Sequence, residues 1–256
     1  MEAESLGGRL LVATPLLGDP NFRRTVILIV EDEPEEGTLG VVLNRPTEVE
    51  VGQVLESWSD LVTGPSVVFK GGPVSPNSAL ALALARGEDE PLGWRSLDGS
   101  SLTSRIGLVD LEAPPELLAG GITSLRVFAG YAGWGPGQLQ AEIEEGAWYV
   151  LPGEPTDAFL AEPERLWQEV LRRQGGEFAI VATYPDDPDA QGRVADIDVA
   201  MGKIEAGFDR LLDTIRRTSG DERNQARMHL LRLFDLFPPR DPRVSKARAT
   251  LSSLLF

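Results

Sequence analysis

The stretch GYAGWGPGQL, residues Gly130–Leu139, holds four glycines, a proline, a tyrosine and a tryptophan within ten positions. It follows the apolar segment Leu125–Ala129, which predicts a strand, and it precedes Gln138–Glu145, which predicts a helix. Its last three glycines alternate with other residues, as a sharp turn from strand to helix requires, because glycine tolerates backbone conformations that other residues avoid. We therefore predict a rigid structural corner.

Such a glycine-rich turn is also compatible with ligand binding. Turns of this kind can hold a phosphate on free backbone N–H groups, but these glycines match neither the dinucleotide-binding nor the P-loop spacing, and Pro136 has no N–H. The following helix carries glutamates and no basic residue, whereas a phosphate needs positive potential there. A corner is favoured over a phosphate loop, and a pocket for a neutral ligand or a peptide, with Tyr131 and Trp134 as walls, stays open as the alternative.

Short apolar segments rich in valine and isoleucine predict strands between residues 9 and 183, with single helices at irregular intervals. Because no strict strand–helix repeat appears, the pattern favours an α+β body with a mixed sheet over a doubly wound parallel sheet. The segment SALALALAR, residues 78–86, alternates leucine and alanine; a helix is the alternative to the strand that we favour. The other expected strands are Arg9–Leu17, Thr25–Glu31, Thr38–Leu43, Ser66–Phe69, Arg105–Leu111, Ser124–Gly130, Trp148–Leu151 and Phe178–Thr183, and the expected helices are Val51–Trp58, a segment starting near Pro114, and Glu162–Arg173.

The charge of the chain changes near residue 190. The whole chain has a net charge of −16, yet residues 1–190 contain 31 Asp and Glu against 12 Lys and Arg, a balance of −19. Residues 191–256 contain 9 acids against 12 bases, a balance of +3. Such a shift indicates a boundary between two parts of different character.

The part after this boundary is predicted to be helical. We expect an α+β domain over residues 1–186, a linker over residues 187–195 and a small all-helical module over residues 196–256. Helical periodicity covers Asp196–Arg217, Arg223–Phe237 and Asp241–Phe256.

The residue types that most often carry catalysis are scarce. The chain has no cysteine, and its one histidine, His229, lies in the helical tail, where a packing or surface role is expected. The body therefore lacks the groups for histidine-dependent triads and thiol nucleophiles, and Lys70 is its only lysine. Paired carboxylates can support hydrolysis, and a carboxylate hydrolase is the enzymatic alternative. We expect no enzymatic activity and no cofactor.

One segment imitates the start of a calcium loop, from Asp187 to Asp198. A calcium loop of this type ends on a bidentate glutamate and follows a helix, whereas this segment ends on an aspartate and follows an expected strand. We therefore expect an acidic linker and no bound metal.

The chain is expected to be cytoplasmic. Its acidic N-terminus lacks the basic region of a secretory signal, and its apolar runs are too short to cross a membrane. We expect no membrane partner.

Five blocks of the body, in order, resemble the YqgE/AlgH family, also catalogued as DUF179. They are GRLLVATPLLGDPNFRRTVILI, GVVLNRP, GGPV, GYAGWGPGQLQAEIEEGAWYV and LWQEVLRRQG. The resemblance implies a compact α+β fold with a small, partly barrel-like β-sheet flanked by helices, here followed by a small all-α helical tail. It implies no agreed catalytic residue, and a role in transcriptional regulation has been proposed for the family. It also implies that strand ends bring Thr14, Asn44 and Arg45 to one surface with Tyr131 and Trp134.

The tail, from Gly192 to Phe256, resembles the tetratricopeptide-like end of thioredoxin-like co-chaperones. That resemblance implies a helical protein-interaction module. A redox function does not transfer, because the chain has no cysteine. Gly207 replaces the small alanine usual in the second repeat helix, which weakens that helix by about 1 kcal/mol.

Together these features predict a non-enzymatic binding or adaptor protein with an unidentified protein partner. A transcription-linked regulator is the alternative. We nevertheless expect no direct binding of nucleic acid, because DNA affinity depends on Lys and Arg at the phosphates and the body has a charge balance of −19. The tail has more apolar residues than about 65 residues can bury alone. We therefore expect it to dock on its own body, to self-associate with a second copy, or to bind a client.

Overall fold

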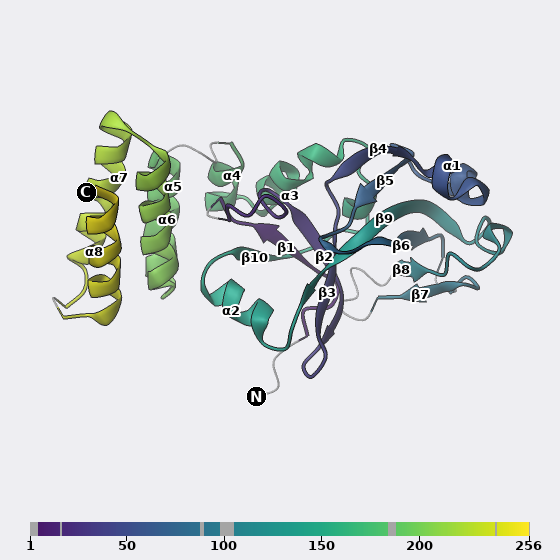
Figure 1. Ribbon diagram of the computed structural model, residues 1–256, viewed down its shortest axis with the longest axis horizontal. Helices are drawn as coiled ribbons and strands as arrows, with labels where there is room; N and C mark the ends of the chain where they lie inside the picture. The colour runs from purple at the N-terminus through teal and green to yellow at the C-terminus, as the bar shows by residue number, and fades with distance from the viewer. Residues whose placement is uncertain are drawn as a thin grey trace. The chain divides into compact units, whose positions relative to one another are not determined.

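The computed structural model describes residues 5–15, 17–87, 90–97, 105–183, 188–238 and 240–255 (Figure 1). The chain divides into two compact units, and most of the sheet belongs to unit 1 while most of the helices belong to unit 2. Unit 1 consists of Met1–Val12, Pro20–Ala141 and Tyr149–Trp167, and unit 2 consists of Ala13–Asp19, Glu142–Trp148 and Gln168–Phe256.

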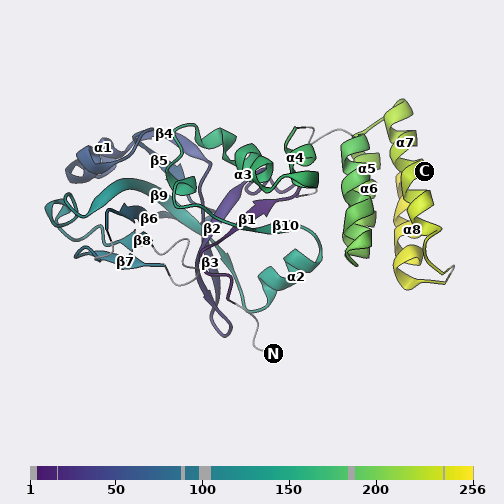
Figure 2. The ribbon, with the colours of Figure 1, turned by 180° about the vertical axis from the view of Figure 1, so that it is seen from behind.

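The sheet is curled and largely antiparallel, and it forms a half-barrel, so the predicted α+β class is confirmed (Figures 1 and 2). Its strands are β1 (Arg9–Ala13), β2 (Val26–Glu33), β3 (Gly37–Val42), β4 (Pro46–Glu50), β5 (Val67–Lys70), β6 (Val74–Ala85), β7 (Trp94–Ser96), β8 (Ile106–Val109), β9 (Ile122–Trp134) and β10 (Trp148–Pro152). Within the described residues, their order is β10–β1–β2–β3–β9–β6–β8–β7. Strand β5 joins this path by pairing with β4 and, in parallel, with β9.

The alternating segment of residues 78–86 lies in β6, so the strand prediction is confirmed there. Its small side chains, Ala81, Ala83 and Ala85, are buried in one cluster with Trp58 and Trp94. Alanine at alternate positions leaves room on that face for two indole rings, which supply the large apolar surface that a core needs. The alternation of leucine and alanine therefore reflects the fit of small side chains against the two indole rings as well as the two-residue period of a strand.

Strand β9 is shared by the two halves of the sheet. Its residues from Ile122 to Tyr131 pair with β6, while the last three, Ala132 to Trp134, pair with β3. Gly130, with φ of 70°, lies close to this change of partner. A Cβ at Gly130 would lie 2.7 Å from the Val74 carbonyl oxygen, so both the conformation and the space require glycine.

A second glycine pair lies directly against this part of β9. A Cβ at Gly71 would be 2.2 Å from the Gly130 carbonyl oxygen, and one at Gly72 would be 2.0 Å from the Tyr131 carbonyl carbon. The Gly71 N–H donates to the Ala129 carbonyl at 2.8 Å. The two backbones thus approach more closely than any side chain would allow.

The corner predicted over Gly130–Leu139 is shorter than expected. Strand β9 continues through Trp134, because Thr38 to Gly40 of β3 provide a ladder for these residues, and only the next few residues form the turn. Of the last three glycines, Gly137 alone has a positive φ, 74°. Gly135 has open space around its Cα and donates its N–H to Gln138 Oε1 at 3.1 Å. The prediction that backbone geometry explains the alternating glycines is therefore wrong for Gly133 and Gly135, while Gly130 and Gly137 do adopt conformations that favour glycine.

Helices follow the sheet and make up most of unit 2. They include α4 (Gly176–Thr183), which contains the segment Phe178–Thr183. The prediction of a final strand in that segment is therefore wrong. A short apolar run has no periodicity to distinguish a helix from a buried strand, and here its neighbours are helical. The helices are α1 (Val51–Val54) and α2 (Gln138–Glu144), then α3 (Leu166–Gln174), α4 (Gly176–Thr183), α5 (Pro188–Ala200), α6 (Ile204–Arg217), α7 (Gly220–Phe234) and α8 (Pro242–Leu255).

The tail differs from its prediction near its start. Residues 188–195, expected to form a linker, lie in α5, while Asp187, at the start of the calcium-like segment, lies outside the described residues. The single helix expected over Asp196–Arg217 is two helices, which separate at Gly202, whose φ is 84°. A glycine in the left-handed conformation commonly ends a helix.

Helix α6 forms the centre of the helical core. Phe208 packs edge-to-face on Phe234 and Phe237, with ring centroids 5.0 and 5.6 Å apart. Arg210, also on α6, is buried and its Nη2 lies 2.9 Å from Asp198 Oδ2 of α5. A Cβ on Gly207 would lie 2.7 Å from Val199 Cγ2, so this glycine permits close packing of α5 on α6. The sequence alone indicates only that Gly207 weakens its helix.

We predict opposite outcomes for two alanine substitutions in the opening stretch. Gly130→Ala should lower the free energy of unfolding by more than about 2 kcal/mol, since it adds a strained conformation to a steric clash. Gly135→Ala should change it by less than about 0.5 kcal/mol, because nothing surrounds the new methyl group. Denaturant unfolding of the two full-length variants measures both. If the two variants lose the same free energy of unfolding, the conformational and steric requirement for glycine does not lie at Gly130.

Candidate functional site

Asn44 connects the end of β3 to the loop that precedes β2. Its side chain is buried, its Oδ1 accepts the Val26 N–H at 3.0 Å, and its Nδ2 donates to the Arg24 carbonyl at 2.9 Å. Arg24 has a φ of 55°, which a non-glycine residue adopts only when its surroundings impose it. Asn44 therefore holds this loop in one conformation.

The loop that Asn44 holds contains the basic residue Arg23, and it accepts hydrogen bonds from two further basic side chains. The Arg45 guanidinium donates to the Arg23 carbonyl, and the Lys70 ammonium donates to Asn21 Oδ1 at 3.0 Å. The backbone N–H of Lys70 in turn donates to the Arg45 carbonyl at 2.8 Å. We call Arg23, Arg45 and Lys70 the basic cluster; it joins segments from three places in the sequence.

The basic cluster lacks the ion pairs that several other cations of the chain make. Arg95 pairs with Glu31 at 2.7 Å, and Arg243 pairs with Asp241 at 2.7 Å. Within the described part of the chain, the side chains of the basic cluster have no carboxylate partner. Burial lowers the pKa of Arg45 below its usual value, because desolvation disfavours the charged form.

Another cation without a carboxylate partner among the described residues, Arg126, has an architectural role. Its side chain is fully buried, donates to the carbonyls of Gly64, Ala158 and Leu160 at 3.0, 3.0 and 3.1 Å, and lies 4.3 Å from the centroid of the Phe69 ring. Burial lowers its pKa to about 10, so it stays charged at neutral pH. Arg126 is enclosed by the fold and is not available to a ligand.

The five residues predicted to share a surface have different positions. Asn44 and Arg45 belong to the site just described. Trp134 is buried and its ring stacks on Phe22 of the same loop at 6.3 Å between centroids. Tyr131 pairs with Val74 at the start of β6.

Thr14 belongs to unit 2 and is not part of this loop. It is buried, its Oγ1 donates to the Gly146 carbonyl at 2.9 Å, and its N–H donates to the Ala147 carbonyl at 3.0 Å. Both bonds connect backbone segments, so the contacts of Thr14 are structural.

The site contains residues that the sequence analysis did not select, namely Asn21, Phe22, Arg23 and Lys70. Arg23 and Lys70 are separated by more than forty positions, and only tertiary hydrogen bonds bring them to one loop. The sequence does offer one signal: basic residues are few in residues 1–190, yet Arg23 and Arg24 are adjacent.

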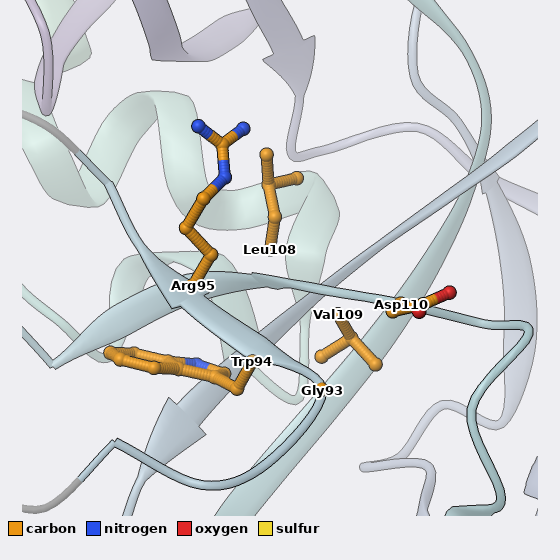
Figure 3. Close-up of a pocket in the computed structure, with 6 residues that line it drawn as sticks. All are labelled: Gly93, Trp94, Arg95, Leu108, Val109 and Asp110. Atoms are coloured by element: carbon orange, nitrogen blue, oxygen red, sulfur yellow. The ribbon is translucent and has the colours of Figure 1, made fainter.

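Elsewhere, a hollow of about 350 Å³ lies along β7 and β8 (Figure 3). Gly93, Trp94 and Val109 are among its lining residues. Arg95 and Asp110 lie at separate ends of it in Figure 3, and Arg95 already pairs with Glu31. Its polar groups do not converge, as those of a ligand site usually do.

Among the described residues, no group of three or more His, Cys, Asp or Glu has the arrangement of a metal site. None of the described helices combines the length and apolar character of a membrane span.

We predict that Asn44→Ala lowers the free energy of unfolding by about 2–4 kcal/mol, because it leaves a buried N–H and a carbonyl without their partner. Asn77→Ala on β6, where the side chain is exposed, is the matched control and should cost less than about 0.5 kcal/mol. Thermal and denaturant unfolding of both variants provide the measurement. If the two variants are equally stable, Asn44 does not hold the loop.

Comparisons with known proteins divide the chain in two. A family model described as AlgH-like matches residues 10–179, and a tetratricopeptide-repeat model matches residues 179–256. A UPF0301 protein of Streptomyces coelicolor is 63% identical over 191 residues, which is 73% of this chain and 96% of that protein. A UPF0301 protein of Mycobacterium tuberculosis is 45% identical over 180 residues, which is 70% of this chain and 88% of that protein. A crystal structure of a Corynebacterium diphtheriae protein has a TM-score of 0.64 at 32% identity, and the match covers 71% of this chain and 99% of that one.

Proposed function

The chain belongs to the AlgH-like family, and from that premise we propose that it is a non-enzymatic cytoplasmic binding protein that engages a protein partner through its C-terminal helices. The observation that carries the proposal is the tetratricopeptide-repeat match over residues 179–256. Helical repeats of this type stack into extended surfaces that bind other proteins.

Exposed apolar side chains on α7 and in the turns that follow α5 and α7 support the proposal. Met201 is 70% exposed, Met228 is 48% exposed and Leu236 is 68% exposed. Methionine is frequent at surfaces that bind several partners, because its flexible, polarizable side chain adapts to different shapes. In the absence of a partner, we expect these exposed side chains to favour self-association.

The composition of the body supports a binding role over a catalytic one. Residues 1–190 contain no histidine and no cysteine, and the described site is built on arginine and lysine. Guanidinium groups stay protonated near neutral pH, so they can hold an anion but do not exchange protons with a substrate. A carboxylate hydrolase would need two carboxylates at one site, and the basic cluster contains none.

The charge of the body disfavours a regulator that contacts DNA directly. Residues 1–190 have a balance of −19, which repels a polyanion at long range. Proteins that bind duplex DNA neutralise several phosphates with Lys and Arg, and the basic cluster supplies three cations. We propose that any effect on transcription is exerted through protein contacts.

The test uses the full-length chain with Met201→Glu and Met228→Glu combined. Charges at these exposed positions should reduce capture of crosslinked protein partners from native lysate at least tenfold, since placing a charge in an apolar interface costs more than about 1.4 kcal/mol. Far-UV circular dichroism should be unchanged, because both side chains are exposed.

The matched control is Val54→Glu, an exposed apolar residue of α1, 58% exposed, which should leave capture unchanged. Identical sets of captured proteins for the wild-type chain and the double variant would refute a role for the C-terminal helices.

A further inference from the structure

We propose that the basic cluster, Arg23, Arg45 and Lys70, is a binding site for a compact oxyanion of the phosphate type. This inference concerns the AlgH-like body and stands independently of the function proposed for the helical tail. It rests on how Arg45 and Lys70 are held against the loop that contains Arg23, on the absence of carboxylates in contact with the three side chains within the described residues, and on the charge of the rest of the body.

Two of the cations are fixed by neutral acceptors on one short loop. The Lys70 ammonium donates to the side chain of Asn21, and the Arg45 guanidinium donates to the carbonyl of Arg23, two residues further along. The Lys70 N–H also donates to the Arg45 carbonyl at 2.8 Å, which joins the end of β5 to the residue that precedes β4. The two charges are therefore positioned before any ligand arrives, which lowers the entropy lost on binding.

Like charges held on one short loop repel each other. Acidic residues outnumber basic ones by 40 to 24, and arginines elsewhere, such as Arg95 and Arg210, contact a carboxylate. Within the described residues, no carboxylate contacts the basic cluster. Burial also lowers the pKa of Arg45. The attraction of a bound anion would offset both the repulsion between the cations and the cost of desolvating the Arg45 guanidinium.

The number of cations and the charge of the body limit the kind of anion. A single carboxylate would offset one cation and leave the others in repulsion, whereas a phosphate carries about two charges and accepts bonds from both guanidinium and ammonium groups. An extended polyanion would reach beyond the cluster into the field of a body with a balance of −19. A compact group with a charge near −2 satisfies both limits.

Exposure makes the site accessible. Arg23 and Lys70 are exposed at the surface, and Arg45 is half-buried. Lysine offers a point charge, and arginine offers a planar set of donors that suits phosphate oxygens.

The test titrates inorganic phosphate into the full-length, ¹⁵N-labelled chain at about 150 mM sodium chloride and follows the backbone amides by NMR. We expect saturable shifts at Asn21–Thr25, Arg45 and Lys70, with a dissociation constant of about 1–10 mM, and at least a tenfold weaker response to acetate. A phosphoserine peptide and a nucleoside monophosphate, added in separate titrations, distinguish a phosphorylated protein from a small metabolite as the source of the phosphate.

Arg23→Gln and Lys70→Gln combined should weaken phosphate binding at least tenfold, and neither side chain is buried, so folding is preserved. Arg86→Gln removes the same kind of charge from an exposed residue outside the cluster and should bind as the wild-type chain does. The proposal is overturned by the absence of saturable shifts up to about 50 mM phosphate, by equal binding of acetate, or by unchanged binding in the double variant.

Discussion

The structure of unit 1 depends on the close approach of two backbones, at Gly71–Gly72 and at Gly130–Ala132. A Cβ at Gly72 would lie 2.0–2.3 Å from three backbone atoms of Tyr131 and Ala132. No side chain fits in that space, so the contact is possible only with glycine. It is here that β9 leaves β6 and pairs with β3, which allows the sheet to curl into a half-barrel.

This approach also determines where the basic cluster lies. The Gly71 carbonyl accepts the Val42 N–H at 2.8 Å, and Leu43 donates to the Val26 carbonyl at 2.8 Å. Asn44 and Arg45 follow directly, and Lys70 precedes Gly71 on the other side of the contact. The crossing of the two glycine segments therefore brings the ends of β3 and β5 to the loop before β2. A site built on loops needs such a rigid support, because its charges must be held in place before a ligand binds.

The sequence predicts the local elements of the sheet better than their connections. Alternation in residues 78–86 correctly predicts β6, since a period of two is a direct consequence of strand geometry. The apolar run Phe178–Thr183 has no period, so the strand predicted there is wrong; its helical state depends on neighbouring helices. Asn44 and Arg45 are recognisable from a family resemblance, but Arg23 and Lys70 join them through hydrogen bonds that no spacing along the chain encodes. Likewise, the need for glycine at position 72 arises from a strand more than fifty residues away.

Hydrogen exchange in the Gly72→Ala variant tests the importance of this close approach most directly. The amides of Val42, Gly71 and Val26 are each bonded across the crossing or through Asn44. The account predicts that their protection falls together in Gly72→Ala by at least tenfold, while Gly133→Ala, whose added methyl group meets only ordinary contacts, leaves it unchanged. Full protection of these three amides in Gly72→Ala would contradict the claim that the glycine crossing holds the sheet and the basic cluster together.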